Sequence, residues 1–188
     1  MPRTHPRVAA TTALLASGLA LGLAGCGGGT AATPTASPPA TPSPIFASDE
    51  EALAAAEEAY AAYAAASAAI GSDGGAGVER LRDLVDTDLY EQSVNEFRQF
   101  EELGLRSEGA SVVSNAMVAD HHTQGDGVVI SVYLCRDVSA VRILDQAGYD
   151  VTPSGRQDRQ SLLVSLQGNR EQLVISQILP WKDRALCE

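Results

Sequence analysis

The chain has 188 residues, of which 24 are acidic and 13 are basic, and its formal net charge at pH 7 is −11. Binding DNA or RNA requires clustered Lys and Arg side chains that displace counterions. Here the basic residues are scattered among a larger number of carboxylates, so the composition disfavours nucleic acid as a partner.

The first 25 residues have the organisation of a secretory signal peptide. Arg3 and Arg7 precede a weakly apolar run at 8–24, and Leu23-Ala24-Gly25-Cys26 then places small residues directly before a cysteine. The run covers about 17 residues, which is the lower limit for crossing a bilayer. It is also interrupted by Thr, Ser and Gly. We therefore predict a cleaved signal at 1–25 and no membrane-spanning helix.

Leu23-Ala24-Gly25-Cys26 resembles the lipobox of bacterial lipoproteins. In that family the cysteine thiol receives a diacylglyceryl group and the peptide is cut before it. The resemblance implies that Cys26 is the lipid-bearing first residue of the mature protein, acylated with chains such as palmitate. The implied location is the extracytoplasmic face of the cell membrane, since two acyl chains suffice for stable anchoring. The alternative is an ordinary secretory signal in which Cys26 is incidental.

Residues 26–47 form a predicted disordered tether. The segment after Cys26 consists almost entirely of Gly, Ala, Thr, Ser and Pro until Ile45 and Phe46, and it cannot bury enough apolar surface to fold. Gly27-Gly28-Gly29-Thr30 lacks the lysine and the strand-to-helix context of a phosphate-binding loop. We interpret it as linker.

Residues 48–188 have the usual size of one domain, and their first half is predicted to be helical. Ser48 followed by Glu51 forms a capping box. Apolar residues then recur at three and four positions to about Ile70, and the predicted buried stripe comprises Leu53, Ala56, Tyr60, Tyr63, Ser67 and Ile70.

Two further helical segments are predicted before the pattern changes. A short one covers 78–85. A longer one is capped by Asp88, with Glu91 at its third position, and ends at Gly104. Its predicted buried stripe comprises Tyr90, Val94, Phe97, Phe100 and Leu103.

After Gly109 the period becomes twofold, which predicts strands at 110–119, 128–136, 140–145, 159–167 and 172–179. Turn residues separate them, and such short connections favour antiparallel neighbours. Helices first and a strand meander second predict an α+β fold in which N-terminal helices pack on a curved antiparallel sheet.

The pattern Cys135-x-Asp137-x-Ser139, Asp145-x-x-Gly148, Arg159 and a terminal Cys187 resembles secreted lipoproteins of high-GC Gram-positive bacteria that carry an NTF2-like (SnoaL-like) domain. The resemblance covers 48–188 and implies the cystatin-like cone of that superfamily. The same fold hosts enzymes, ligand binders and dimerisation units, so fold alone does not define function.

With Cys26 lipidated, Cys135 and Cys187 remain as one pair in an oxidising compartment. We predict a disulfide between them. The alternative, a reactive thiol, requires an activating base nearby, and the sequence indicates none.

The candidate cavity residues are few. His121 and His122 follow Asp120 at the end of a predicted strand, so one histidine is expected to face the space between helices and sheet and the other to face water. Asp137 and Arg159 match the family pattern and are expected to form a structural ion pair or, alternatively, an acid/base couple. No second His or Cys group joins the two histidines to make a metal site, and no dinucleotide or nucleophile motif is present.

Two functions remain open. The first is non-catalytic binding of a small ligand or an envelope protein by a lipid-anchored monomer or homodimer, with no cofactor. The second is a SnoaL-like enzyme that acts on a small apolar substrate, using an acid such as Asp120 with a histidine. A buried carboxylate within hydrogen-bond reach of a histidine would favour the enzyme.

Overall fold

The structure is a computed structural model that describes residues 44–188. The predicted signal peptide, Cys26 and most of the predicted tether lie outside the described residues. The last part of the tether is described, and there Phe46 is buried while Ile45 packs against the same core. The packed part of the chain therefore begins shortly before Ser48, the predicted boundary.

The first helix is α1 (Asp49–Ser72), and the predicted cap at Ser48 is confirmed. The Ser48 hydroxyl accepts a hydrogen bond from the Glu51 amide at 3.3 Å. In return, the Glu51 carboxylate accepts one from the Ala47 amide at 2.8 Å, one residue earlier than in a regular capping box. These two bonds fix where the helix starts.

The second helical pair differs from the prediction in its details. The segment 78–85 contains only a 3₁₀ turn, η1 (Val78–Leu81), and α2 (Thr87–Glu102) is capped by Asp86 rather than Asp88. The Asp86 carboxylate accepts from the Leu89 amide at 2.9 Å. Gly104 follows α2 with φ +63°, a left-handed conformation that suits glycine and stops the helix as predicted.

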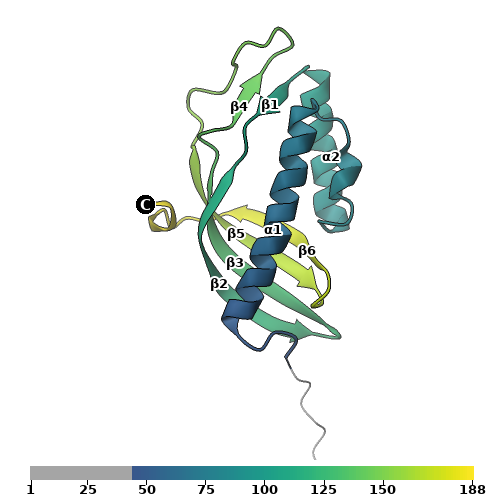
Figure 1. The fold of residues 1–188 in the computed structure, drawn as a ribbon, viewed down its shortest axis with the longest axis vertical. Coiled ribbons are helices and arrows are strands. Elements are labelled where there is room, and N and C mark those ends of the chain that lie inside the picture. Colours follow the sequence, from purple (N-terminus) through teal and green to yellow (C-terminus); the bar gives the residue numbers. More distant parts are fainter. Residues whose placement is uncertain (1–43) are drawn as a thin grey trace, which may run out of the picture. The chain divides into compact units, whose positions relative to one another are not determined.

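The predicted apolar stripe of α2 is only half buried. Tyr90, Val94, Phe97 and Phe100 are partly exposed, and Leu103 is 69% exposed. The helix lies beside α1 rather than over the sheet (Figure 1), so its apolar face is covered on one side only.

Four antiparallel strands form the main sheet in the order β2-β3-β5-β6. They are β2 (Val112–Gln124), β3 (Gly127–Asp137), β5 (Arg159–Gly168) and β6 (Leu173–Pro180). All four correspond to predicted strands, although β2 runs five residues beyond its predicted end. Helix α1 covers one face of this sheet, as Figure 1 shows, and the predicted α+β class is confirmed.

The expected meander is interrupted by a separate small sheet. The predicted strand at 140–145 is reduced to β4 (Arg142–Leu144), which pairs with β1 (Arg106–Glu108), a strand the sequence pattern did not indicate. As a result β3 pairs directly with β5. The two-stranded sheet lies at the end of the domain where α1 finishes (Figure 1).

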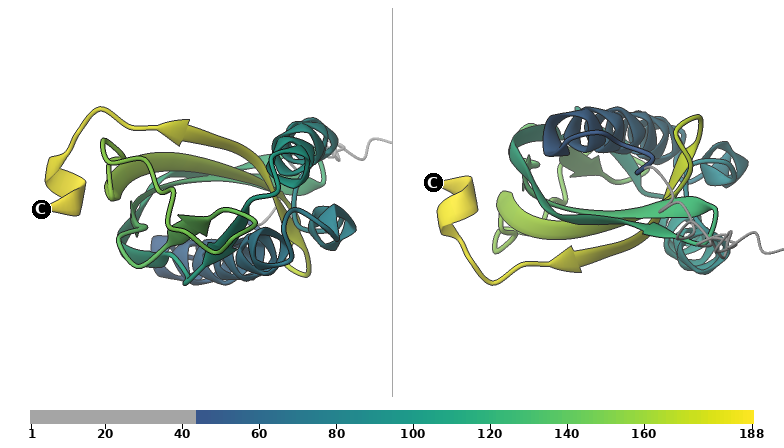
Figure 2. Two further views of the ribbon diagram at one scale, coloured as in Figure 1. Left: turned by 90° about the horizontal axis from the view of Figure 1, so that it is seen from above. Right: turned by 90° about the horizontal axis from the view of Figure 1, so that it is seen from below.

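Two irregularities bend β2. Its pairing with β3 shifts register between Ser114 and Met117 and again between Val118 and Asp120, and Asn115 has φ +53°. Bulges of this kind increase the local twist of a strand. Figure 2 shows the strands curving past α1, so the sheet has a concave face that receives the helix.

The core lies between α1 and this concave face. Along β3, the side chains of Val128, Ile130, Val132 and Leu134 are buried toward the helix, as the alternation predicted. Their partners from α1 include Ala52, Ala56, Tyr60 and Ile70, all buried. Within residues 44–188, none of the helices has both the length and the apolar character that a bilayer crossing requires.

The C-terminal tail returns to the opposite, outer face of the sheet. Trp181 packs on Tyr133 with ring centroids 4.6 Å apart, and the tail ends in a 3₁₀ turn, η2 (Ala185–Cys187). Cys187 is disulfide-bonded to Cys135 of β3, with an S–S distance of 2.00 Å. The predicted disulfide is therefore present, and it fastens the tail to the centre of the sheet.

Candidate functional site

The structure separates the two histidines as the strand period predicted. His121 pairs with Ile130 across the sheet, so it shares the core-facing side of β2, and its Nε2 lies 3.0 Å from a carboxylate oxygen of Asp49 on α1. His122 faces the other way, with its Nδ1 2.7 Å from the Asp120 carboxylate. The three predicted candidates are therefore not one cluster, because His122 pairs with Asp120 and His121 pairs with Asp49.

Neither histidine has the buried acid that the enzyme alternative requires. The Asp49 side chain is 75% exposed and that of Asp120 is 65% exposed, while the His121 ring is 20% exposed. In solvent, such carboxylates are screened and hydrated. Residues 44–188 also contain no group of three or more His, Cys, Asp or Glu side chains placed to hold a metal ion.

Asp137 and Arg159 form an ion pair at 3.6 Å. They are register partners, Asp137 as the last residue of β3 and Arg159 as the first residue of β5. Hydrogen bonds from Ser139, and then the charge of Arg159, hold the pKa of Asp137 below its ordinary value of 3.8. The pair thus has the structural geometry that we expected. Asp145 closes its own turn by accepting from the amides of Ala147 and Tyr149.

A groove runs between α1 and the strands β2 and β3. Its apolar end is a cavity of about 210 Å³ whose lining includes Ala56 and Ala61 of α1, Ala116 of β2, and Val132 and Leu134 of β3. Within the described residues, one carboxylate lines this groove, that of Glu57, which is exposed on α1 at the apolar end.

The next part of the groove is polar. A cavity of about 180 Å³ is lined by Tyr63 and Ser67 of α1, Ser107 of β1 and Arg136 of β3, and Tyr60 lines both cavities. The two cavities follow one another along α1 and along β3, with Tyr60 between them. We call these two adjoining cavities, which share Tyr60, the groove, with an apolar and a polar end.

Two polar atoms at this end are buried without a hydrogen-bond partner. The Ser67 hydroxyl and the Arg136 Nε are inaccessible to solvent and make no hydrogen bond. Arg136 Nη2 donates to Oε1 of Gln160 on β5. A buried donor without an acceptor is costly, and both residues line this cavity.

Burial raises the pKa of Tyr60 and of Tyr63 above the ordinary value of 10.0, because the phenolate is disfavoured away from water. The charge of Arg136 opposes this effect at both rings. The two phenols therefore remain protonated at neutral pH and can donate hydrogen bonds.

Sequence analysis did not single out Arg136, although a signal was present. Counting in twos from the buried Val132 and Leu134 places Arg136 on the same core-facing side of β3. Tyr60, Tyr63 and Ser67 were assigned to the buried stripe of α1 and were interpreted as core alone. The missing step was to infer that the core-facing side of β3 and the buried stripe of α1 line the same site.

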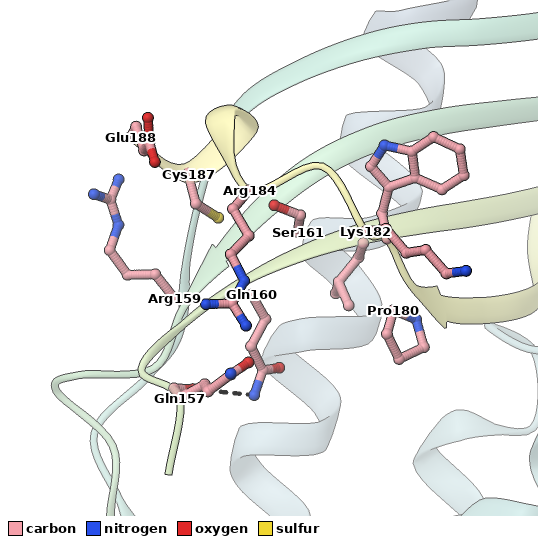
Figure 3. A pocket seen from close by; sticks show the side chains of 11 residues that line it. Gln157, Arg159, Gln160, Ser161, Pro180, Lys182, Arg184, Cys187 and Glu188 are labelled. Carbon is pink, nitrogen blue, oxygen red and sulfur yellow. Dashed lines mark hydrogen bonds between the residues drawn. The ribbon is translucent and has the colours of Figure 1, made fainter. Parts of the chain in front are cut away.

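A second pocket, of about 640 Å³, lies on the outer face where the tail crosses β5 (Figure 3). Arg159 and Glu188 lie at one side of it and Arg184 and Ser161 near its centre. The Ser161 hydroxyl is buried without a partner. Glu188 lines the same pocket, so the lining carries negative as well as positive charge.

No protein-family model matches the chain, and no curated protein matches it in sequence. Among solved structures, the chain is similar to one described as the crystal structure of the intermembrane space region of the chloroplast protein ARC6. The TM-score is 0.51 and the identity 12%, over 70% of this chain and 97% of that chain. At that identity the likeness shows a shared fold alone.

Proposed function

We propose that this chain is a lipoprotein anchored by Cys26 on the extracytoplasmic face of the cell membrane, and that its NTF2-like domain binds a small ligand without turning it over. The lipobox-like sequence supports the anchor. The disulfide between Cys135 and Cys187 supports an oxidising compartment. Helix α1 on the concave face of a curved antiparallel sheet supports the NTF2-like assignment.

The observation that carries the binding function is the groove beneath α1. It joins an apolar cavity to a cavity in which Ser67 and Arg136 hold buried polar atoms without partners. Apolar walls with a few convergent polar groups are the usual composition of small-molecule sites. The histidines and Asp120 lie outside both cavities, which supports binding over acid/base catalysis by those residues.

The anchor is tested by Cys26→Ser. We expect the variant to leave the membrane fraction or to persist as the uncut precursor. Cys135→Ala/Cys187→Ala is the matched control, because it removes two cysteines without changing the lipobox, and it should fractionate as the wild type does. Unchanged fractionation of Cys26→Ser would refute the anchor.

The groove is tested by blocking it. Ala61 lines the apolar cavity and is exposed at its rim, whereas the neighbouring Ala62 is exposed and lines neither cavity. We expect octanoate, 1-octanol or octylamine to shift amide NMR resonances of α1 and β3, and Ala61→Phe to abolish the shifts that Ala62→Phe retains. If none of the three probes perturbs the groove residues, the domain does not bind ligands there.

A further inference from the structure

Arg136 occupies an unusual place in the sheet. It continues the core-facing row of β3 after Val132 and Leu134, and its register partners are Val113 on β2 and Gln160 on β5. The guanidinium therefore lies at the end of an apolar row, beneath α1, and not on the outer face where the neighbouring Asp137 meets Arg159.

This cation has no anionic partner. None of the ion pairs among residues 44–188 involves Arg136. Its guanidinium donates to the neutral amide of Gln160 and also lies near the neutral phenol of Tyr60, where burial raises the pKa and the charge of Arg136 opposes that rise. Arg136 is half-buried, and withdrawing a charge from water without a counterion is unfavourable. An anion that enters the groove would compensate this charge.

The surrounding groups select the kind of anion. A guanidinium only donates hydrogen bonds, and its planar fork matches a carboxylate. The side chains of Arg136 and Ser67 both line the polar cavity, and the phenols of Tyr60 and Tyr63 lie at the same end. With a single cation in a cavity of about 180 Å³, the charge balance favours a monoanion over a phosphate dianion.

The rest of the ligand must be apolar. Beyond Tyr60 the groove continues between Ala56 and Ala61 on one side and Val132 and Leu134 on the other. Glu57 at that end disfavours a second negative charge on the ligand.

We infer that the groove binds an amphiphilic monocarboxylate, with its carboxylate on Arg136 and Ser67 and its apolar body between α1 and β3. This inference rests on the proposed binding function and specifies its ligand class.

The probes are octanoate, 1-octanol and octylamine, which share a chain and differ in the charge of the head group. Their dissociation constants are measured by calorimetry and NMR on the mature domain. We expect octanoate to bind about tenfold or more tightly than octanol, as a charge-assisted hydrogen-bonded pair requires, and octylamine to bind most weakly. Equal affinities for octanoate and octanol would overturn the inference and leave the binding function intact, whereas loss of all binding would refute both.

Variants of Arg136 and Ser67 test where the carboxylate of the ligand binds. Arg136→Gln should remove the preference for octanoate over octanol, whereas Arg159→Gln, which deletes the same charge from the end of β5 outside the groove, should retain it. If Arg136→Gln does not fold, Ser67→Ala provides the second measurement and should weaken octanoate binding several-fold with little effect on octanol. The assignment would be overturned if folded Arg136→Gln still preferred octanoate over octanol. If Arg136→Gln does not fold, an unchanged preference in Ser67→Ala would overturn it.

Discussion

Removing the disulfide tests how the tail stabilises the domain. Cys135 and Cys187 are separated by 52 positions, and chain entropy assigns about 4 kcal/mol to a loop of that length. For a domain near 150 residues, each kcal/mol corresponds to about 2–4 °C in Tm, so Cys135→Ala/Cys187→Ala should lower Tm by roughly 10 °C. Reduction of the wild-type protein should produce a similar loss.

The assay is urea unfolding followed by two signals. Far-UV circular dichroism reports the helices and the sheet, and fluorescence reports Trp181, the single tryptophan, which lies on the tail against Tyr133. In the oxidised protein the two transitions should coincide. A free energy of unfolding for the double variant within about 1 kcal/mol of the oxidised wild type would refute the reasoning, because the loop-closure contribution would then be absent.

Three further predictions concern the fold. Ser48→Ala should cost about 1 kcal/mol, since the cap of α1 is lost, measured by urea unfolding with the conservative Ser48→Thr as control. Leu166→Ala, at a fully buried position, should cost about 2–5 kcal/mol, whereas Leu103→Ala, on the exposed end of α2, should change stability by less than about 0.5 kcal/mol; equal costs would contradict the assigned core. Because Tyr60 and Tyr63 have raised pKa values, their contribution to stability is complete below the unfolded pKa near 10 and is lost as pH rises through the folded values. Tyrosinate absorbance should therefore show a late-titrating phase that is missing from the double Phe variant, and a full titration near pH 10 in the native protein would contradict the burial.

The parts of the fold that were predictable are those encoded by local periodicity. The buried row on β3 and the Ser48 cap follow from spacing within a few residues. The cap of α2 was placed two residues late because Asp86 and Asp88 are both good N-caps, and only the hydrogen bond that the Leu89 amide donates to the Asp86 carboxylate distinguishes them.

The parts that were missed depend on distant partners. β1 has three residues and no clear alternation, and it is a strand because β4, more than 30 residues later, pairs with it. The polar end of the groove likewise combines α1 with β3. Periodicity predicts that Tyr60 and Arg136 both point inward, but it does not predict that they meet.

The two bulges of β2 have a consequence for how the protein behaves among its own copies. β2 is an edge of the main sheet, and an uninterrupted edge strand is a template for further strands from other chains. The register shifts on either side of Met117 and Val118 leave a regular ladder only toward each end of the strand. The same irregularities that curve the sheet around α1 therefore also disfavour strand addition and fibril growth at its open edge, which matters most where many copies are crowded together.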